Sequence, residues 1–280
     1  MGNILELFEY GFFIRALLAA ILTSISCGII GTYIVSRRLV FISGGITHAS
    51  FGGIGLAWFL GLNPIAGAAV FGVLSAFGVE FFTKRSEIRE DSAIGILWSF
   101  GMALGIIFIF LTPGYAPNLM SYLFGSILTV TQLDIYLMLA LAILIGLVFI
   151  LLADVIIISA FDEEYARTRK LPVSIIKYSM MAFIALTIVL SIRVVGIILV
   201  LSMLTIPQST ANLFTRSFKQ MAWLSILIAM LGSGSGLIIS YFMNIPSGAS
   251  IIFTLVLIFA LAKSGVSIAQ KTRLKKKLEA

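Results

Sequence analysis

Long apolar runs are the feature that most limits what this chain can fold into. A helix needs ~20 apolar residues to cross a hydrocarbon core of ~30 Å, and the sequence holds about nine stretches that meet this requirement. Of its 280 residues, 60% are hydrophobic and only 11% are charged, whereas a soluble domain carries about 25% charged residues. We therefore predict an all-α fold, a polytopic transmembrane helix bundle that forms a single membrane domain over residues 1–280.

The boundaries of the predicted spans follow the limits of these apolar runs. Arg193 alone separates the sixth run from the seventh, so eight or ten spans also fit the sequence. The predicted spans are residues 12–36, 41–60, 64–82, 92–111, 133–158, 175–192, 194–213, 220–242 and 247–264.

Positive charges are sorted to alternate ends of these spans. If the N-terminus lies outside, every Lys and Arg except Arg15 and Arg193 falls on the inner side. Positive residues belong on the cytoplasmic side, so we predict an N-out, C-in orientation. The net charge of +7 then flanks the membrane and does not indicate a nucleic-acid partner. The basic tail, residues 265–280, is expected to anchor at lipid headgroups.

The motifs of several enzyme classes are missing. The sequence contains neither a GxxxxGK[ST] phosphate loop nor an HExxH zinc motif, so it does not bind ATP or zinc by those devices. A single cysteine, Cys27, excludes an internal disulfide and a cysteine-rich metal site. A chain that crosses the membrane this often without chemistry of its own is expected to conduct a solute. We predict a transport protein, not an enzyme, whose energy comes from elsewhere.

The only histidine, His48, lies inside the second predicted span. On a helix, Gly44, Gly45, Gly52 and Gly55 share its face, which leaves room for another helix backbone or for a small passenger. An ionisable side chain at membrane depth is a functional candidate by default. The alternative is a packing histidine bonded to a neighbouring carbonyl. The sequence does not decide between the two.

A second group of candidates surrounds a proline in the seventh predicted span. Pro207 removes a backbone donor and frees the carbonyl of Met203. Neighbouring polar side chains could satisfy that carbonyl or line a polar path, and a small-residue stripe on the first span could pack closely against another helix. The candidates for a pathway or for packing are Cys27, Ser202, Thr205, Pro207, Gln208 and Ser209.

Two connections are longer than simple turns. The outer segment, residues 112–132, is uncharged and apolar, and it is suited to a gate, a shelf for a partner or a structural plug. Its gate candidates are Met120, Tyr122, Phe124 and Gly125. The inner segment, residues 159–174, places acidic residues before basic ones, the order that a short helix prefers. Glu163 and Arg167 form an i, i+4 pair, and Pro172 is expected to end the helix. This segment fits a contact surface for a cytoplasmic partner better than a solvated linker.

Four stretches resemble the membrane subunit of bacterial ABC importers for zinc, manganese or ferrous iron, the metal-specific ABC permease family. SRRLVFISGGITHASFGGIGLA resembles its second-span signature and MSYLFGSILTVTQLD its mid-chain outer motif. VVGIILVLSMLTIPQSTANLF resembles its late-span signature, and FDEEYA with the following LP its coupling segment. The four occur in the expected order and cover nearly the whole chain.

The resemblance implies a type II importer-like permease in the bacterial cytoplasmic membrane. The expected partners are a second copy of the chain, cytoplasmic ATP-binding cassette subunits, an extracytoplasmic metal-binding protein and membrane lipid. No permanently bound cofactor is expected, since Zn²⁺ or Mn²⁺ would be the cargo. His48 falls on the histidine thought to meet the metal. The coupling helix that rests on the ATPase would comprise residues 162–172, with Asp162, Glu163, Ala166, Arg167, Leu171 and Pro172.

Two alternatives remain open at this point. In the turn before His48, where members of the family often carry an aspartate, this chain has Gly45. Imidazole with carboxylate suits zinc or manganese, so the missing carboxylate favours a chelated metal or another small solute as cargo. A secondary transporter or a scaffold protein is the other alternative, and it would be active without an ATPase.

Overall fold

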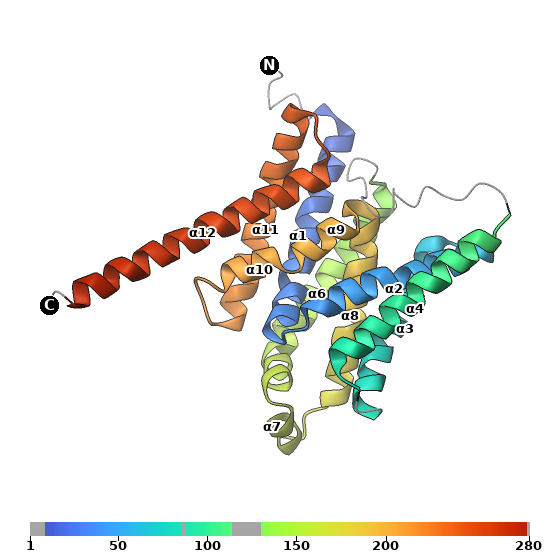
Figure 1. Ribbon diagram of the computed structural model, residues 1–280, viewed down its shortest axis with the longest axis horizontal. Helices are drawn as coiled ribbons and strands as arrows, with labels where there is room; N and C mark the ends of the chain where they lie inside the picture. The colour runs from blue at the N-terminus through green and yellow to red at the C-terminus, as the bar shows by residue number, and fades with distance from the viewer. Residues whose placement is uncertain (1–8, 86–87, 114–129, 279–280) are drawn as a thin grey trace.

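The described part of the chain consists of helices joined by short loops. This computed structural model describes residues 9–85, 88–113 and 130–278, and no strand occurs within those ranges. The helices, shown in Figure 1, are α1 (Gly11–Ser36), α2 (Val40–Phe59), α3 (Pro64–Arg85), α4 (Glu90–Leu111), α6 (Gln132–Phe161), α7 (Glu163–Thr168), α8 (Val173–Val195), α9 (Ile197–Met203), α10 (Ile206–Ala211), α11 (Phe218–Met243) and α12 (Ser247–Leu278).

Eight of these helices are long and apolar enough to cross a membrane: α1, α2, α3, α4, α6, α8, α11 and α12. Each overlaps one of the predicted spans, which confirms the predicted all-α membrane bundle. The tail predicted as a separate segment after residue 264 continues α12, which is helical to Leu278.

The seventh predicted span, residues 194–213, is wrong as a single helix. The chain crosses this region as two short helices, α9 of seven residues and α10 of six. Gly196, with φ 81°, separates α8 from α9, and Thr205, with φ −129°, separates α9 from α10. Pro207 stands in the first turn of α10, where its missing N–H costs nothing. Arg193 does not mark the boundary, because α8 continues past it to Val195.

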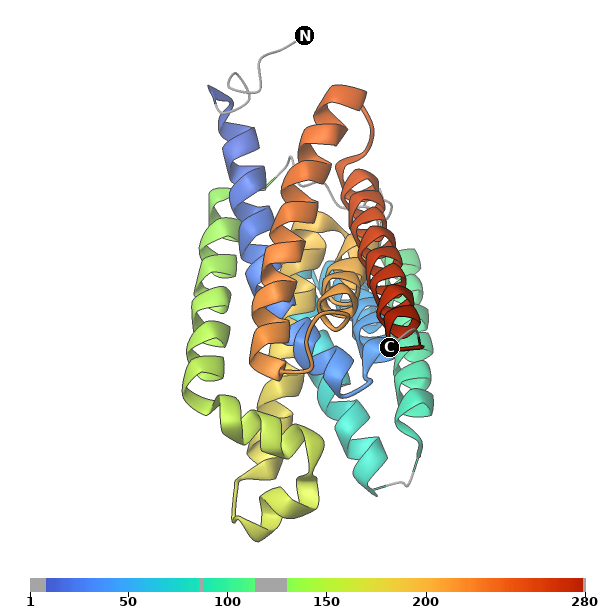
Figure 2. The same cartoon turned by 90° about the vertical axis from the view of Figure 1, so that its left-hand side faces the viewer.

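The bundle is organised around α1 and α2. Helix α1 packs against α6, α8 and α11, while α2, α3 and α4 form a second group that joins the first through α8. In the most apolar stretch of α2, 78% of the residues are buried, against 17% in α12. Helix α12 packs on α11 near its start and then extends away from the bundle (Figure 1). Seen from the side, α6 lies at one edge of the molecule and α12 toward the other (Figure 2).

The ends of several helices follow from local sequence. Thr131 and Asp134 form a reciprocal capping box at the start of α6, which accounts for an acidic residue near the end of an apolar span. The Asn63 side chain accepts from the backbone of Ile65 at the start of α3. Asn244 ends α11 in the left-handed conformation, with φ 53°, which asparagine tolerates better than most residues.

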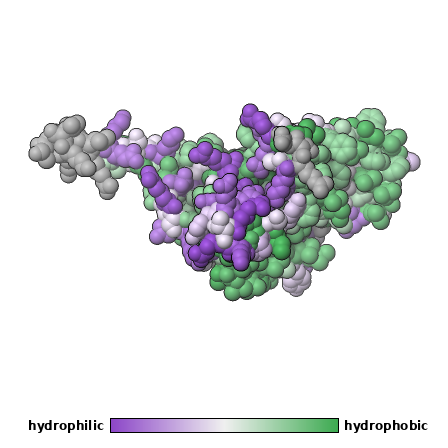
Figure 3. Space-filling view, turned by 90° about the horizontal axis from the view of Figure 1, so that it is seen from below, coloured by the Kyte–Doolittle hydropathy of each residue, from purple (hydrophilic) through white to green (hydrophobic). Residues whose placement is uncertain are grey.

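Hydrophilic residues gather at one end of the molecule. Figure 3 looks onto the end that carries α7 and shows hydrophilic side chains across its middle, with hydrophobic surface on the flanks. Large apolar side chains are exposed on the sides of the bundle, such as Phe110, 87% exposed, and Ile150, 80% exposed. Such a surface suits contact with lipid or with another membrane-embedded chain.

Candidate functional site

The His48 side chain lies between α2 and α4. It is half-buried, and its ring stacks on the Trp98 indole with centroids 4.4 Å apart and planes 5° apart. Within the described residues, the buried Nδ1 atom of His48 has no hydrogen-bond partner. The packing alternative, a histidine bonded to a neighbouring carbonyl, therefore finds no such bond at Nδ1 within the described residues. An imidazole nitrogen without a partner can act as a ligand.

The glycines around His48 serve close helix packing. A Cβ atom at Gly45 would lie 2.4 Å from the Ile94 Cγ2 atom, and one at Gly52 would lie 2.7 Å from the Gly101 carbonyl oxygen. One at Gly55 would lie 2.5 Å from the Gly105 carbonyl oxygen. Of the two possibilities that the sequence leaves open, Gly52 and Gly55 therefore admit the backbone of α4, and Gly45 is covered by the Ile94 side chain.

Gly44 differs from the other glycines beside His48. A Cβ atom there would lie 3.4 Å from the nearest Trp98 atom and 3.8 Å from the Leu201 side chain, which is close to ordinary van der Waals contact. Gly44 is one turn before His48 and on the same face. Leu201 belongs to α9, so α2, α4 and α9 meet at this point.

The hydroxyl candidates on α9 and the start of α10 form a half-buried row. Ser202, Thr205 and Ser209 are all of intermediate exposure. The Ser202 hydroxyl donates to the Ile198 carbonyl at 3.1 Å, and the Thr205 hydroxyl donates to the Leu201 carbonyl at 2.8 Å. Their oxygens still have lone pairs that can accept a hydrogen bond or face a cation. Helix α9 contacts α2, and Leu201, the neighbour of Ser202 in sequence, lies beside Gly44.

Gln208 and Cys27 are buried inside the protein. Gln208 is 0% exposed, and its Nε2 atom donates to the Cys27 carbonyl at 2.8 Å and to the Met203 carbonyl at 3.1 Å. The Met203 carbonyl, at the end of α9, is therefore satisfied by a side chain, as the sequence suggested for the carbonyl four residues before Pro207. Cys27 and Pro207 are also buried. The position of these three residues supports packing, not a pathway.

The inner segment forms the predicted short helix, α7. The Asp162 side chain accepts from the Tyr165 N–H at its start, and Arg167 bonds to Glu163 at 2.8 Å. The helix ends before Pro172, which precedes α8. Its end is a Schellman turn, in which the Leu171 N–H donates to the Ala166 carbonyl and the Lys170 N–H donates to the Arg167 carbonyl. Lys170 has φ 57°, a conformation that glycine adopts more easily.

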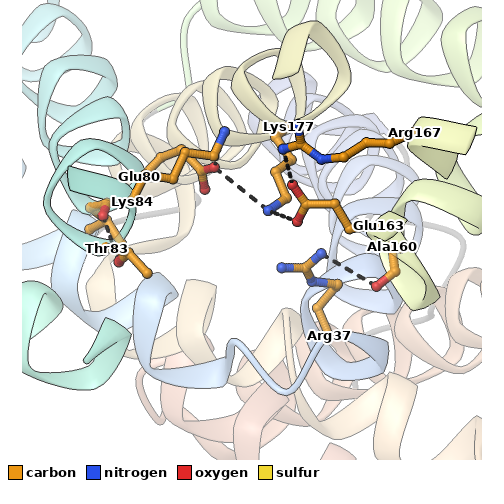
Figure 4. Close-up of polar contacts among 9 residues, drawn as sticks. Arg37, Glu80, Thr83, Lys84, Ala160, Glu163, Arg167 and Lys177 are labelled. Atoms are coloured by element: carbon orange, nitrogen blue, oxygen red, sulfur yellow. Dashed lines mark hydrogen bonds and ion pairs between the residues drawn. The ribbon is translucent and has the colours of Figure 1, made fainter. Parts of the chain in front are cut away.

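A chain of ion pairs joins α7 to the bundle (Figure 4). The Lys177 ammonium, on α8, contacts the Glu163 carboxylate of α7 and lies 3.7 Å from the Glu80 carboxylate of α3. Lys84 completes the group at 2.9 Å from Glu80. Lys177 is 8% and Glu80 is 5% exposed. The attraction between their charges is therefore far less screened by water than that of a surface ion pair. A further bond, from Arg37 to the Ala160 carbonyl at 3.3 Å, joins the end of α1 to the end of α6.

The pKa of Glu163 reports this environment. Partial burial alone would raise the pKa of this carboxyl group. Lys177 and Arg167 donate hydrogen bonds to the carboxylate and carry positive charge, and together these effects outweigh burial and lower the pKa to about 2. Ala166, on the same short helix, is 0% exposed. Helix α7 is therefore fixed to the bundle through both a buried apolar contact and a buried charge.

Three residues of these sites were not among the candidates from the sequence. Trp98 carries no sequence signal, because its contact with His48 depends on the packing of α2 against α4. Lys177 reads as one more inner positive charge, and Glu80 reads as a residue at the end of a span. The i, i+4 spacing of Glu80 and Lys84 within an apolar helix was the one available signal.

The remaining candidates are not placed. Met120, Tyr122, Phe124 and Gly125 of the outer segment lie outside the described residues. Within the described ranges, no group of three or more His, Cys, Asp or Glu side chains could hold a metal ion. The described part of one copy therefore offers His48 and oxygen atoms, but no complete set of metal ligands.

Comparison with known proteins gives consistent matches along the chain. The profile of the ABC 3 transport family matches residues 9–264. A membrane protein of Synechocystis sp. is 43% identical over 244 residues, which cover 87% of each chain. The manganese transport system membrane protein MntC of Halalkalibacterium halodurans is 34% identical, covering 92% of this chain and 88% of its own. The solved structure of PsaBC from Streptococcus pneumoniae in complex with Fab is similar with a TM-score of 0.81 at 33% identity, covering 93% of this chain and 95% of that chain.

Proposed function

Because the chain belongs to the ABC 3 transport family, we propose that it is the permease subunit of an ATP-driven importer for a divalent transition metal. Manganese is the metal named for the relative from Halalkalibacterium halodurans, and zinc fits the same imidazole ligand. ATP hydrolysis belongs to a separate cytoplasmic subunit in this proposal. An extracytoplasmic binding protein delivers the metal.

The observation that carries the proposal is the charged connection from α7 to α3. Helix α7 lies at the hydrophilic end of the molecule (Figure 3), and Lys177 connects its Glu163 to Glu80 (Figure 4). Helix α3 in turn packs on α2, which carries His48. A partner that moves α7 is therefore connected, through Lys177 and α3, to the helix that carries the histidine.

In the proposed mechanism, α7 is the coupling helix. ATP binding draws two ATPase subunits together, and each pushes on the α7 that rests against it. The Glu163–Lys177–Glu80 connection passes the movement to α8 and α3. The helices then switch a path between two copies of the chain from outward-open to inward-open, and the outer segment, residues 112–132, closes it above.

The proposed cargo contact is His48 from each of the two copies. The Ser202 and Thr205 hydroxyls and retained waters supply oxygen ligands in place of the metal's hydration shell. Such a site binds a bare cation weakly, which suits a conductor because the ion must also be released.

The coupling role is tested by Lys177→Met in proteoliposomes that hold this chain, its ATPase subunits and the metal-loaded binding protein. Loss of the shared ammonium leaves Glu163 and Glu80 without their common partner, so Mn²⁺ or Zn²⁺ uptake should fall at least tenfold. Stimulation of ATP hydrolysis by the loaded binding protein should be lost as well. Lys263→Met, on the exposed side of α12, is the matched control. Full coupling in the Lys177→Met protein would contradict the proposal.

The His48 contact is tested at limiting metal in the same system. Phenylalanine keeps a ring that can stack on Trp98 but has no ligand nitrogen, so His48→Phe separates coordination from packing. We expect uptake to fall by on the order of tenfold or more in both His48→Phe and His48→Ala. Full uptake by either protein would show that His48 does not meet the metal.

A chelated metal is the second candidate cargo. It is favoured by the lack of a group of three ligand side chains within the described residues, because a chelate brings its own ligands. Competition on the partner binding protein separates the two candidates. Displacement of bound ⁵⁴Mn²⁺ by free ions alone supports the bare metal, and displacement only by the chelate supports the alternative.

A further inference from the structure

A deep apolar groove lies on the side of the bundle, between α6 and α11 with α1 as its floor. Helix α1 packs against both neighbours, which lie beside it in Figure 2. The groove has a volume of about 480 Å³, comparable with that of one long fatty-acyl chain. Its lining includes Ile25, Gly146, Ile150, Trp223, Ile226 and Met230. No part of the proposed route from α7 to His48 lies in this groove.

The length of the groove corresponds to one leaflet of a bilayer. On α11 the lining residues run from Lys219 to Met230, a rise of about 16 Å in a helix. Half of a hydrocarbon core is about 15 Å. Lys219 is the second residue of α11 and so marks the membrane surface, and Trp223, one turn deeper, stands where amphipathic rings are enriched.

The mouth of the groove carries one positive and one negative charge. The Lys219 ammonium lies 3.0 Å from the Asp154 carboxylate, and the two side chains are 61% and 81% exposed. Just inside, the Phe149 and Phe218 rings stack with centroids 6.1 Å apart. A neutral pair of opposite charges attracts neither a cation nor an anion as a whole. It does match a headgroup that carries a phosphate and an ammonium together.

We propose that this groove is a binding site for one phospholipid with an amine-bearing zwitterionic headgroup, the chemistry of phosphatidylethanolamine. One acyl chain fills the groove from the surface to Met230. The Lys219 ammonium contacts the phosphate, and the Asp154 carboxylate accepts a hydrogen bond from the lipid ammonium. Phosphatidylcholine has no N–H to donate to Asp154, and an anionic lipid such as phosphatidylglycerol brings no ammonium to pair with it, so both bind less well.

Trp223 provides a direct readout of the bound lipid. In a protein with Trp58→Phe and Trp98→Phe, Trp223 is the only tryptophan, and brominated acyl chains quench its fluorescence on contact. We expect brominated phosphatidylethanolamine in mixed vesicles to quench at several-fold lower mole fraction than brominated phosphatidylcholine or phosphatidylglycerol. The measurement needs no ATPase and no metal, so it stands apart from the test of the proposed function.

Gly146 offers a way to close the groove without disturbing the fold. A Cβ atom at Gly146 would meet nothing within 4 Å, so Gly146→Leu adds its side chain to open space in the groove. We expect this variant to lose the preferential quenching while it unfolds at an unchanged or higher temperature. Gly265→Leu, at an equally open position on α12, is the matched control and should quench like the parent protein.

The headgroup contact has its own variant. Lys219→Gln with Asp154→Asn keeps the apolar groove and removes both charges, so quenching by phosphatidylethanolamine should drop to the level of phosphatidylcholine. Equal quenching by all three lipids in the parent protein would mean ordinary boundary lipid and would overturn the proposal. No quenching by any lipid would mean that protein covers the groove, which overturns it equally.

Discussion

At the scale of single residues, the two glycines before His48 are not equivalent. The family resemblance draws attention to Gly45 as the position without a carboxylate. A Cβ atom at Gly45 would collide with the Ile94 side chain, whereas one at Gly44 would make ordinary van der Waals contact with Trp98. The place where this fold could accept an additional ligand is therefore Gly44, one position earlier in the sequence.

Gly44→Asp is expected to fold normally and to add a carboxylate on the face of His48, since residues four apart on a helix are neighbours. It should increase the affinity for Mn²⁺ at least tenfold, measured by titration of the purified protein. Gly45→Asp should destabilise the protein by about 1–3 kcal/mol through overpacking and should not increase affinity. If instead Gly44→Asp were destabilised and Gly45→Asp bound Mn²⁺ more tightly, α2 would be rotated relative to the described packing.

Gln208 is expected to stabilise the fold and not to line a pathway, because its buried side chain bridges two backbone carbonyls. Gln208→Leu leaves the Cys27 and Met203 carbonyls without their donor, which costs on the order of 1–2 kcal/mol within a membrane bundle. The midpoint of thermal unfolding in detergent should fall accordingly. Ser209→Ala, one residue further and half-buried, should leave the midpoint within error. Unchanged stability in Gln208→Leu would contradict the bridging role.

The sequence predicts local relations at this scale better than distant ones. Pro207 frees the Met203 carbonyl by a rule of helix geometry, so a nearby amide could be named as its partner. The stacking of His48 on Trp98 depends on how α2 and α4 pack, and no pattern in either helix indicates it. The same holds for Lys177, whose two carboxylate partners lie on different helices.

At the scale of elements, α7 shows how a six-residue helix can be stable. A helix this short is marginal alone, but α7 has a side-chain cap from Asp162, the Glu163–Arg167 pair and the Lys177 contact. The order of charges predicted the helix. Its attachment to the bundle could not be predicted, because Lys177 lies on the next long helix and its second partner, Glu80, lies on α3, far away in sequence. The break between α9 and α10 was not predicted, because hydropathy shows one continuous apolar run in which Pro207 indicates only a freed carbonyl.

The attachment of α7 should weaken in acid. The pKa of Glu163 is about 2 in the folded protein, below its usual 4.5. The stabilisation by its charge is therefore complete above pH 4.5 and is lost as the pH falls from 4.5 toward 2. Pepsin, active in this range, should cut between residues 161 and 171 increasingly as the pH falls, relative to an unfolded reference peptide.

Glu163→Gln provides the control for this pH dependence. It removes the titrating group, so cleavage at pH 4 should already match that of the parent protein at pH 2. Equal protection of the parent protein at pH 4.5 and pH 2.5 would show that the ion pair does not hold α7.

At the scale of the whole molecule, the sorting of positive charges predicts which end faces the cytoplasm. The eight long helices alone would leave both ends of the chain on the same side of the membrane. An N-out, C-in orientation therefore requires a ninth crossing, made by α9 and α10 together. Hydropathy predicts the spans because the bilayer imposes their length. It says little about which helices are neighbours, since apolar residues face lipid and protein alike.

The orientation can be read from cysteine labelling, because the native Cys27 is 0% exposed and gives little background. Arg169→Cys, in the loop after α7, should react with a membrane-impermeant maleimide only after the inner side is made accessible. Leu62→Cys, 61% exposed in the parent protein between α2 and α3, should react in intact cells. Labelling of Arg169→Cys in intact cells would invert the topology and remove the basis for a cytoplasmic partner at α7.

The glycine seam between α2 and α4 has a mechanical consequence. Where Gly52 faces Gly101 and Gly55 faces Gly105, peptide groups touch with no pliable side chain between them, and Gly53 meets Gly67 of α3 in the same way. We therefore expect the three helices to move as one rigid unit, so that a displacement of α3 at Glu80 is shared by the helix that carries His48, and a single added methyl group along the seam would have to push two backbones apart.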